Sequence, residues 1–123
     1  GLPPVFHYRP LALGEMEHKL DVLRSLCEEI GRDPSAIVMS VEAVLALAPD
    51  DAALPAVRQL AEKRFGGPGF GLHDGGLIGT PQAVVERLGE IREMGFGQVV
   101  LFTHDRASDA TLDLLAGEVL PHL

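Results

Sequence analysis

Residues 95–102 read Gly95-Phe96-Gly97-Gln98-Val99-Val100-Leu101-Phe102. Two glycines interrupt a helical pattern, and a short apolar run follows them. A run of this kind is typical of a buried strand in a parallel sheet. We therefore expect a strand over residues 98–103. Helical patterns flank this strand on both sides, which indicates a protein built from alternating helices and strands.

Three other phrases mark boundaries of the same kind along the chain. They are Gly31-Arg32-Asp33-Pro34, Ile78-Gly79-Thr80-Pro81 and Glu118-Val119-Leu120-Pro121. Glycine commonly follows the last turn of a helix, and proline is tolerated in a first turn but stops a helix elsewhere. The phrases therefore predict the order helix, strand, helix, strand, helix.

Helices are expected wherever apolar residues recur at spacings of three and four. The first covers residues 15–30 and the second opens at Pro49-Asp50-Asp51. The third starts at Thr80-Pro81 and ends at Gly95, and the last starts at Ser108 or Asp109. Their expected apolar stripes are Met16, Leu20, Leu23, Cys27 and Ile30; Leu54, Val57, Ala61 and Phe65; Val84, Leu88 and Ile91; and Leu112, Leu115 and Val119.

Residues 37–47 form a long apolar run that we interpret as a strand buried on both faces. A helix is the alternative, because alanine, leucine and methionine favour helices. Glu42 is unusual in such a strand, since a buried carboxylate needs a partner, a proton or a wet cavity. It is either a salt-bridged or strand-end glutamate or a polar group that faces a substrate pocket.

Two stretches lack a regular pattern. Residues 1–14 contain three prolines and are expected to form an extended lead-in. Residues 66–79 contain seven glycines and are expected to form an insertion, either as a surface loop or in contact with a ligand. Gly79 and Thr80 begin a helix there and could hold a phosphate group. His73 in this stretch is either an exposed loop residue or a substrate-facing one.

Polar residues follow the predicted strand 98–103 directly, in the order Thr103-His104-Asp105-Arg106. Ligands of parallel β/α proteins bind outside the carboxyl ends of the strands. Thr103 and His104 are therefore candidate substrate-facing residues, and Arg106 is a candidate clamp for an anionic group. In the alternative, Asp105 and Ser108 are only turn and capping residues, and Arg106 forms a surface pair. No catalytic residue can be assigned from the sequence.

Composition excludes several classes of function. The 123 residues carry a net charge of −8, which disfavours nucleic acid and membrane surfaces as partners. One cysteine gives neither a disulfide framework nor a cysteine metal site, and we expect no bound metal. The expected setting is reducing and cytoplasmic. Because residue 1 is glycine, we expect a processed product or a piece of a longer protein.

Together the phrases resemble the C-terminal part of the luciferase-like monooxygenase family. This superfamily includes bacterial luciferase and deazaflavin-dependent oxidoreductases. The match rests on three stretches: Gly31-Arg32-Asp33-Pro34 with Ile37; Gly79-Thr80-Pro81 with Val84-Val85-Glu86-Arg87-Leu88; and Leu112-Asp113-Leu114-Leu115 with Glu118-Val119-Leu120-Pro121. Their order and spacing over residues 15–123 carry the resemblance.

The resemblance implies an α/β fold, namely the C-terminal part of a TIM-type (β/α)8 barrel that is incomplete in this chain. It also implies a redox reaction of a small-molecule substrate with FMN or the deazaflavin coenzyme F(420). The residues at positions that match the family are Gly79, Thr80, Thr103, His104, Asp105 and Arg106. Residues 37–47 and 98–103 would be the last two barrel strands, and residues 50–79 would cover the active-site mouth.

A barrel of this class has eight strands, and this sequence predicts two. Two such strands would leave open sheet edges, so we expect a homo-oligomer or a missing N-terminal barrel segment. The chain is then a fragment of a flavin- or deazaflavin-dependent monooxygenase or oxidoreductase that is not active alone. The alternative is a non-catalytic module derived from that fold that self-associates or binds a small ligand.

Overall fold

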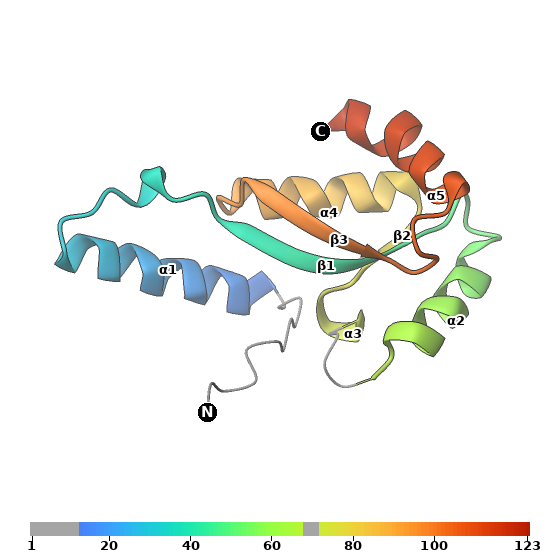
Figure 1. Ribbon diagram of the computed structural model, residues 1–123, viewed down its shortest axis with the longest axis horizontal. Helices are drawn as coiled ribbons and strands as arrows, with labels where there is room; N and C mark the ends of the chain where they lie inside the picture. Colours follow the sequence, from blue (N-terminus) through green and yellow to red (C-terminus); the bar gives the residue numbers. More distant parts are fainter. Residues whose placement is uncertain (1–12, 68–71) are drawn as a thin grey trace.

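The computed structural model describes residues 13–67 and 72–123, and a parallel sheet lies at its centre (Figure 1). The sheet has three strands in the order β2-β1-β3, with β1 at Ser40–Leu47, β2 at Leu77–Gly79 and β3 at Gln98–Thr103. Leu47 is level with Gly79, and Leu45 is level with Thr103. The carboxyl ends of the strands therefore share one edge. The predicted α/β class is confirmed.

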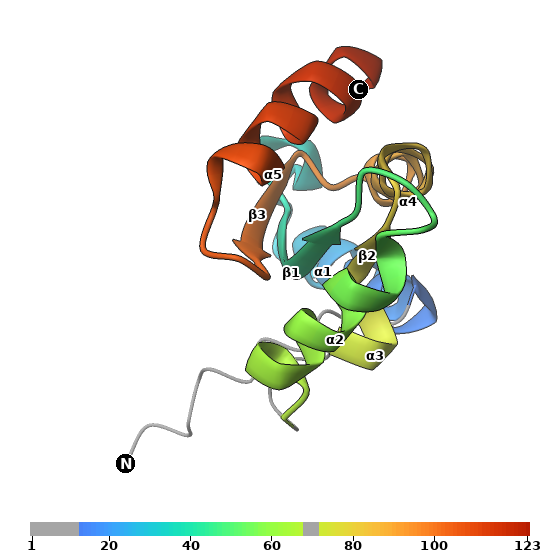
Figure 2. The same ribbon diagram turned by 90° about the vertical axis from the view of Figure 1, so that its right-hand side faces the viewer.

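Helices cover both faces of this sheet (Figure 2). α4 (Pro81–Glu93) and α5 (Asp109–Leu114) lie on one face, and α2 (Leu54–Phe65) and α3 (Leu72–Gly75) lie on the other. α1 (Leu13–Glu29) precedes the sheet. The short elements are η1 (Pro34–Ala36), the π-helical η2 (Leu115–Val119) and η3 (Leu120–His122).

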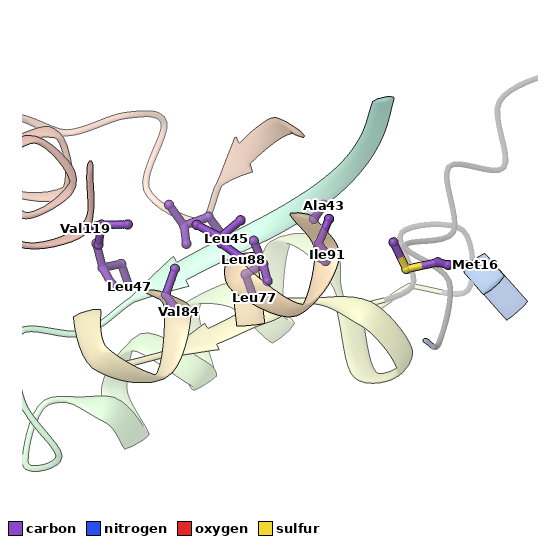
Figure 3. Packing of buried hydrophobic residues seen from close by; sticks show 9 residues of the cluster. All are labelled: Met16, Ala43, Leu45, Leu47, Leu77, Val84, Leu88, Ile91 and Val119. Carbon is purple, nitrogen blue, oxygen red and sulfur yellow. The ribbon is translucent and has the colours of Figure 1, made fainter. Parts of the chain in front are cut away.

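The core follows from the alternation of side chains along β1. Ala43, Leu45 and Leu47 pack with α4 and Val119 in one cluster (Figure 3). Val44 and Ala46 point the other way and pack with α2 and α3. The second half of β1 is thus buried on both faces, as its apolar run predicts.

The structure corrects the predicted strands in three places. A third strand, β2, and the short helix α3 lie inside residues 66–79, which we expected to be an irregular insertion. β1 begins at Ser40 rather than at residue 37, because the turn η1 occupies residues 34–36. β3 has the predicted bounds but is not buried, since Val100 and Phe102 are 39% and 42% exposed. It is an edge strand that pairs with β1.

The predicted helices are found, with differences at their ends. Gly31 and Gly95 follow α1 and α4 with positive φ angles of 69° and 111°, the conformation for which glycine is favoured. α2 begins at Leu54, after a turn in which Asp50 accepts the Ala53 N–H. Ile30 lies beyond α1 and is therefore exposed rather than part of its apolar stripe.

The last helix departs most from its predicted stripe. Val119 is buried as expected, but Leu112 is 46% exposed, and Thr111 is buried in its place. The π-helical turn η2 has more residues per turn than an α-helix, so a stripe drawn at α-helical spacing does not continue across it.

The predicted lead-in, residues 1–14, lies almost wholly outside the described residues, and its last two residues belong to α1. Within the described part of the chain, none of the helices has the length and hydropathy that crossing a bilayer requires.

Candidate functional site at the carboxyl edge of the sheet

A tight turn after β3 forms the most elaborate polar structure at the carboxyl edge of the sheet. It runs from Thr103 to Ser108, which is the N-cap of α5. The His104 N–H donates to Leu45 O at 2.9 Å, so the ladder between β1 and β3 continues one residue past the strand. Arg64 at the end of α2 donates to His104 O at 2.8 Å. Both contacts fix the start of the turn.

Asp105 is the centre of this turn. Its Oδ2 accepts hydrogen bonds from the hydroxyls of Ser108 and Thr111, and the Thr111 bond is 2.6 Å long. Ser108 in turn accepts the Thr111 N–H, as an N-cap residue does. The prediction that Asp105 and Ser108 are turn and capping residues is therefore confirmed. One carboxylate ties the end of β3 to the first turn of α5.

The pKa of Asp105 lies below its ordinary value of 3.8. Burial alone would raise this pKa, but hydrogen bonds from Ser108 and Thr111 and the charge of His104 outweigh burial. His104 Nε2 lies 3.9 Å from Asp105 Oδ2. Asp105 is thus held in its charged form, which lets it accept from both hydroxyls.

His104 is buried, with only 5% of its surface exposed. Its Nδ1 atom has no hydrogen-bond partner among the described residues. A buried polar atom without a partner costs roughly 1–3 kcal/mol. The imidazole lies buried beside Asp105, and its expected contact with a substrate stays a prediction.

Arg106 and Ala107 carry backbone strain in the same turn. Their φ angles are 61° and 55°, in the left-handed region that residues other than glycine rarely adopt. The Ala107 N–H donates to the Thr103 hydroxyl across the turn, which helps to hold this conformation. The turn presents the exposed Arg106 at the sheet edge. Strain of this kind is concentrated at functional sites.

Gly79 and Thr80 lie at the same edge, at the end of β2. A side chain at Gly79 would come within 2.9 Å of Ala83 Cβ, so this glycine permits close packing of the first turn of α4. Thr80 occupies the N-cap position, but its side chain makes no capping hydrogen bond. The prediction of the helix start is therefore confirmed.

Glu42 and His73 lie away from this turn. Glu42 is level with Val100, near the amino end of β1, and its Oε2 atom is buried without a hydrogen-bond partner among the described residues. His104 follows Val100 by four residues, which corresponds to roughly 13 Å of strand. His73 is exposed on α3. The structure therefore unites Thr103, His104 and Arg106, but not Glu42 or His73.

Sequence reasoning missed two residues of the turn. Thr111 was not singled out, although its place three residues after Ser108 fits a helix N-terminus. Arg64 approaches from α2, forty positions earlier in the chain, and its contact leaves no local signal.

Across residues 13–67 and 72–123, His, Cys, Asp and Glu side chains form no group of three that could hold a metal ion. Cys27 is buried as expected of a core residue. Comparisons of the chain with protein-family models and with curated proteins found no match. The resemblance to the luciferase-like family thus stays a prediction.

Asp105 is expected to make the free energy of unfolding depend on pH. Because its pKa is lowered by folding, its contribution is fully present above the ordinary pKa and is lost as the pH falls through the lowered value. Asp105→Asn should therefore destabilise the chain at neutral pH and much less in strong acid. Urea unfolding at both pH values measures this. Asp113→Asn, an exposed change on α5, is the control, and an equal loss at both pH values would contradict the prediction.

Proposed function

We propose that this chain is the C-terminal segment of a flavin- or deazaflavin-dependent oxidoreductase of the luciferase-like type, and that further parallel strands complete its sheet as a (β/α)8 barrel. The observation that carries the proposal is the incomplete pairing and the exposure of β3. Among the described residues β3 pairs with β1 alone, and two of its apolar side chains are about 40% exposed. Native proteins protect or cover an exposed apolar edge strand, and a further strand would do so here.

The part of the Glu42 face that α2 and α3 leave exposed adds support. Glu42 pairs with Val100 in register, so both side chains lie on the same face, together with Phe102. This face combines exposed apolar side chains with a buried carboxylate oxygen that has no partner within the described residues. We infer that the missing strands or a substrate cover it. In this proposal Glu42 lines the substrate side of this face.

The carboxyl edge has groups that fit the phosphate of a flavin nucleotide. Arg106 is exposed there, and the N-terminus of α4 presents unpaired amides after Gly79 and Thr80. β1 lies between β2 and β3, so the strand ends that precede these two groups are about two strand spacings, roughly 10 Å, apart. At such a separation one group would hold a phosphate and the other would contact a different part of an extended cofactor. When bound, the FMN or F(420) would supply the two-electron chemistry.

The second candidate function is a non-catalytic module that self-associates. The same exposed residues of β3 favour it. A second copy of the chain could cover them just as the further strands of an enzyme would. Flavin binding separates the two candidates, since only the first requires it.

Titration with FMN, coenzyme F(420) and inorganic phosphate tests the proposal. We expect one of the two cofactors to bind more tightly than phosphate. Arg106→Gln should weaken that binding about tenfold, as expected for loss of one charge-assisted hydrogen bond. Arg58→Gln, which changes an exposed arginine on α2, should have no effect. Binding of neither cofactor, or equal loss in both variants, would contradict the proposed role.

A further inference from the structure

The turn that carries Arg106 joins β3 to α5 and is strained (Figure 1). Arg106 and Ala107 have φ angles of 61° and 55°, which residues other than glycine rarely adopt. The same turn contains the buried His104 Nδ1, which has no hydrogen-bond partner in the described part of the chain. A strained turn keeps its shape only where its surroundings fix it. The groups that fix this turn therefore decide where Arg106 lies.

Thr103 receives both backbone N–H groups of the strained pair. Its carbonyl oxygen accepts the Arg106 N–H at 3.5 Å, and its hydroxyl oxygen accepts the Ala107 N–H. The first of these bonds is long for a hydrogen bond, so the hydroxyl makes the closer contact. Every residue type supplies a carbonyl oxygen, but only serine and threonine place a hydroxyl on the β-carbon. The hold on Ala107 therefore depends on the side chain at position 103.

The Thr103 hydroxyl is itself anchored to the sheet. Thr103 is the last residue of β3 and is level with Leu45 on β1. The next residue, His104, donates its N–H to Leu45 O at 2.9 Å. Thr103 is also β-branched and partly buried, which restricts its χ1 angle. The hydroxyl is therefore a fixed point from which the strained pair is held.

Two other side chains hold the ends of the turn. Asp105 joins it to α5 through the hydroxyls of Ser108 and Thr111, and Arg64 on α2 contacts its backbone. Within residues 13–67 and 72–123, neither Asp105 nor Arg64 bonds to the N–H groups of the strained pair. The conformation of that pair is therefore set mainly from position 103.

We propose that Thr103 is the positioning residue of the anion site at the carboxyl edge of the sheet. Its hydroxyl holds Ala107 and so fixes the backbone that carries Arg106. Thr103 acts through Arg106 and is not itself a ligand of the anion. The inference rests on the proposed function for the identity of that anion, a group of the cofactor. The hold on the turn exists without the cofactor.

Amide hydrogen exchange of the 123-residue chain, without cofactor, tests the hold on the turn. Thr103→Val keeps the branched shape but lacks the hydroxyl, so the Ala107 N–H should exchange about tenfold faster. Thr103→Ser retains the hydroxyl and should exchange like the unsubstituted chain. The His104 N–H, which bonds to β1, should stay protected in both variants. Equal Ala107 exchange in the two variants, or loss of His104 protection together with that of Ala107 in Thr103→Val, would overturn the proposal.

Cofactor binding shows whether Thr103 acts through Arg106. The titrant is FMN or F(420), whichever the unsubstituted chain binds more tightly. Thr103→Val should weaken its binding about fivefold, and Thr103→Ser should not. In the Arg106→Gln background, Thr103→Val should cause no further loss, because the side chain that it positions is gone. A further fivefold loss in that background would show that Thr103 is not a positioning residue for Arg106.

Failure of the proposed function has a different signature. Binding of neither cofactor to the unsubstituted chain would contradict the proposed function and this use of Arg106. The exchange of the Ala107 N–H would still decide whether Thr103 holds the turn, since that measurement requires no ligand.

Discussion

Replacing Leu45 with alanine is expected to lower the free energy of unfolding by about 2–5 kcal/mol. Leu45 is completely buried and sits where β1 pairs with both neighbours, level with Leu77 and Thr103. Its side chain belongs to the cluster that joins the sheet to α4 (Figure 3). The loss combines the lost transfer of apolar surface with the cavity left behind. Since small domains are stable by only about 5–15 kcal/mol, the variant should be close to unfolding.

Urea denaturation followed by circular dichroism measures this loss. Leu60→Ala is the matched control, because the same side chain is removed from an exposed position on α2. Its effect should stay within about 0.5 kcal/mol. Similar losses in the two variants would mean that the sheet does not organise the fold as described.

The strongest local signals predicted the elements well. β3 has the predicted bounds because Gly95 and Gly97 precede an unambiguous apolar run. α4 begins at Pro81 and ends before Gly95. Proline is favoured in the first turn of a helix, and glycine is favoured just after the last turn. The buried half of β1 follows from its apolar residues at both odd and even positions.

β2 could not be predicted because its cause lies elsewhere in the chain. Three residues are too few to show an alternating pattern, and glycines surround them. The strand forms because Leu77 and Ile78 pair with the free side of β1. The exposure of β3 is also not a local property, since the same apolar run would be buried beside a further strand.

The candidate site was predicted in position rather than in detail. The rule that ligands bind at the carboxyl ends of parallel strands selected Thr103 to Arg106, and the strained turn lies there. His104 is buried and receives a hydrogen bond from Arg64 on α2, and no local pattern encodes that long-range contact. Glu42 was recognised as unusual, but its level on β1 became known only from its register with Val100.

Val100→Lys is expected to prevent association of the chain through β3. The isolated chain should self-associate, because the apolar side of β3 lacks the cover that further strands would give. A lysine at position 100 would bring a charged side chain into that apolar contact, where association would have to remove it from water. We expect the dissociation constant of the oligomer to rise at least about thirtyfold, which corresponds to roughly 2 kcal/mol. Sedimentation equilibrium measures this change.

The same variant should keep the fold of the single chain. Val100 is already 39% exposed, and it stands level with Glu42, whose Oε2 has no partner among the described residues. A lysine there would face this carboxylate across the strands, and such opposite-charge pairs contribute about 0.2–1 kcal/mol. The Val100→Lys variant should therefore weaken association without lowering the free energy of unfolding of the single chain. Leu112→Lys, at a similarly exposed leucine on α5, should leave association unchanged. If the unsubstituted chain is monomeric at every concentration, or if both lysine variants dissociate it equally, β3 is not the contact surface.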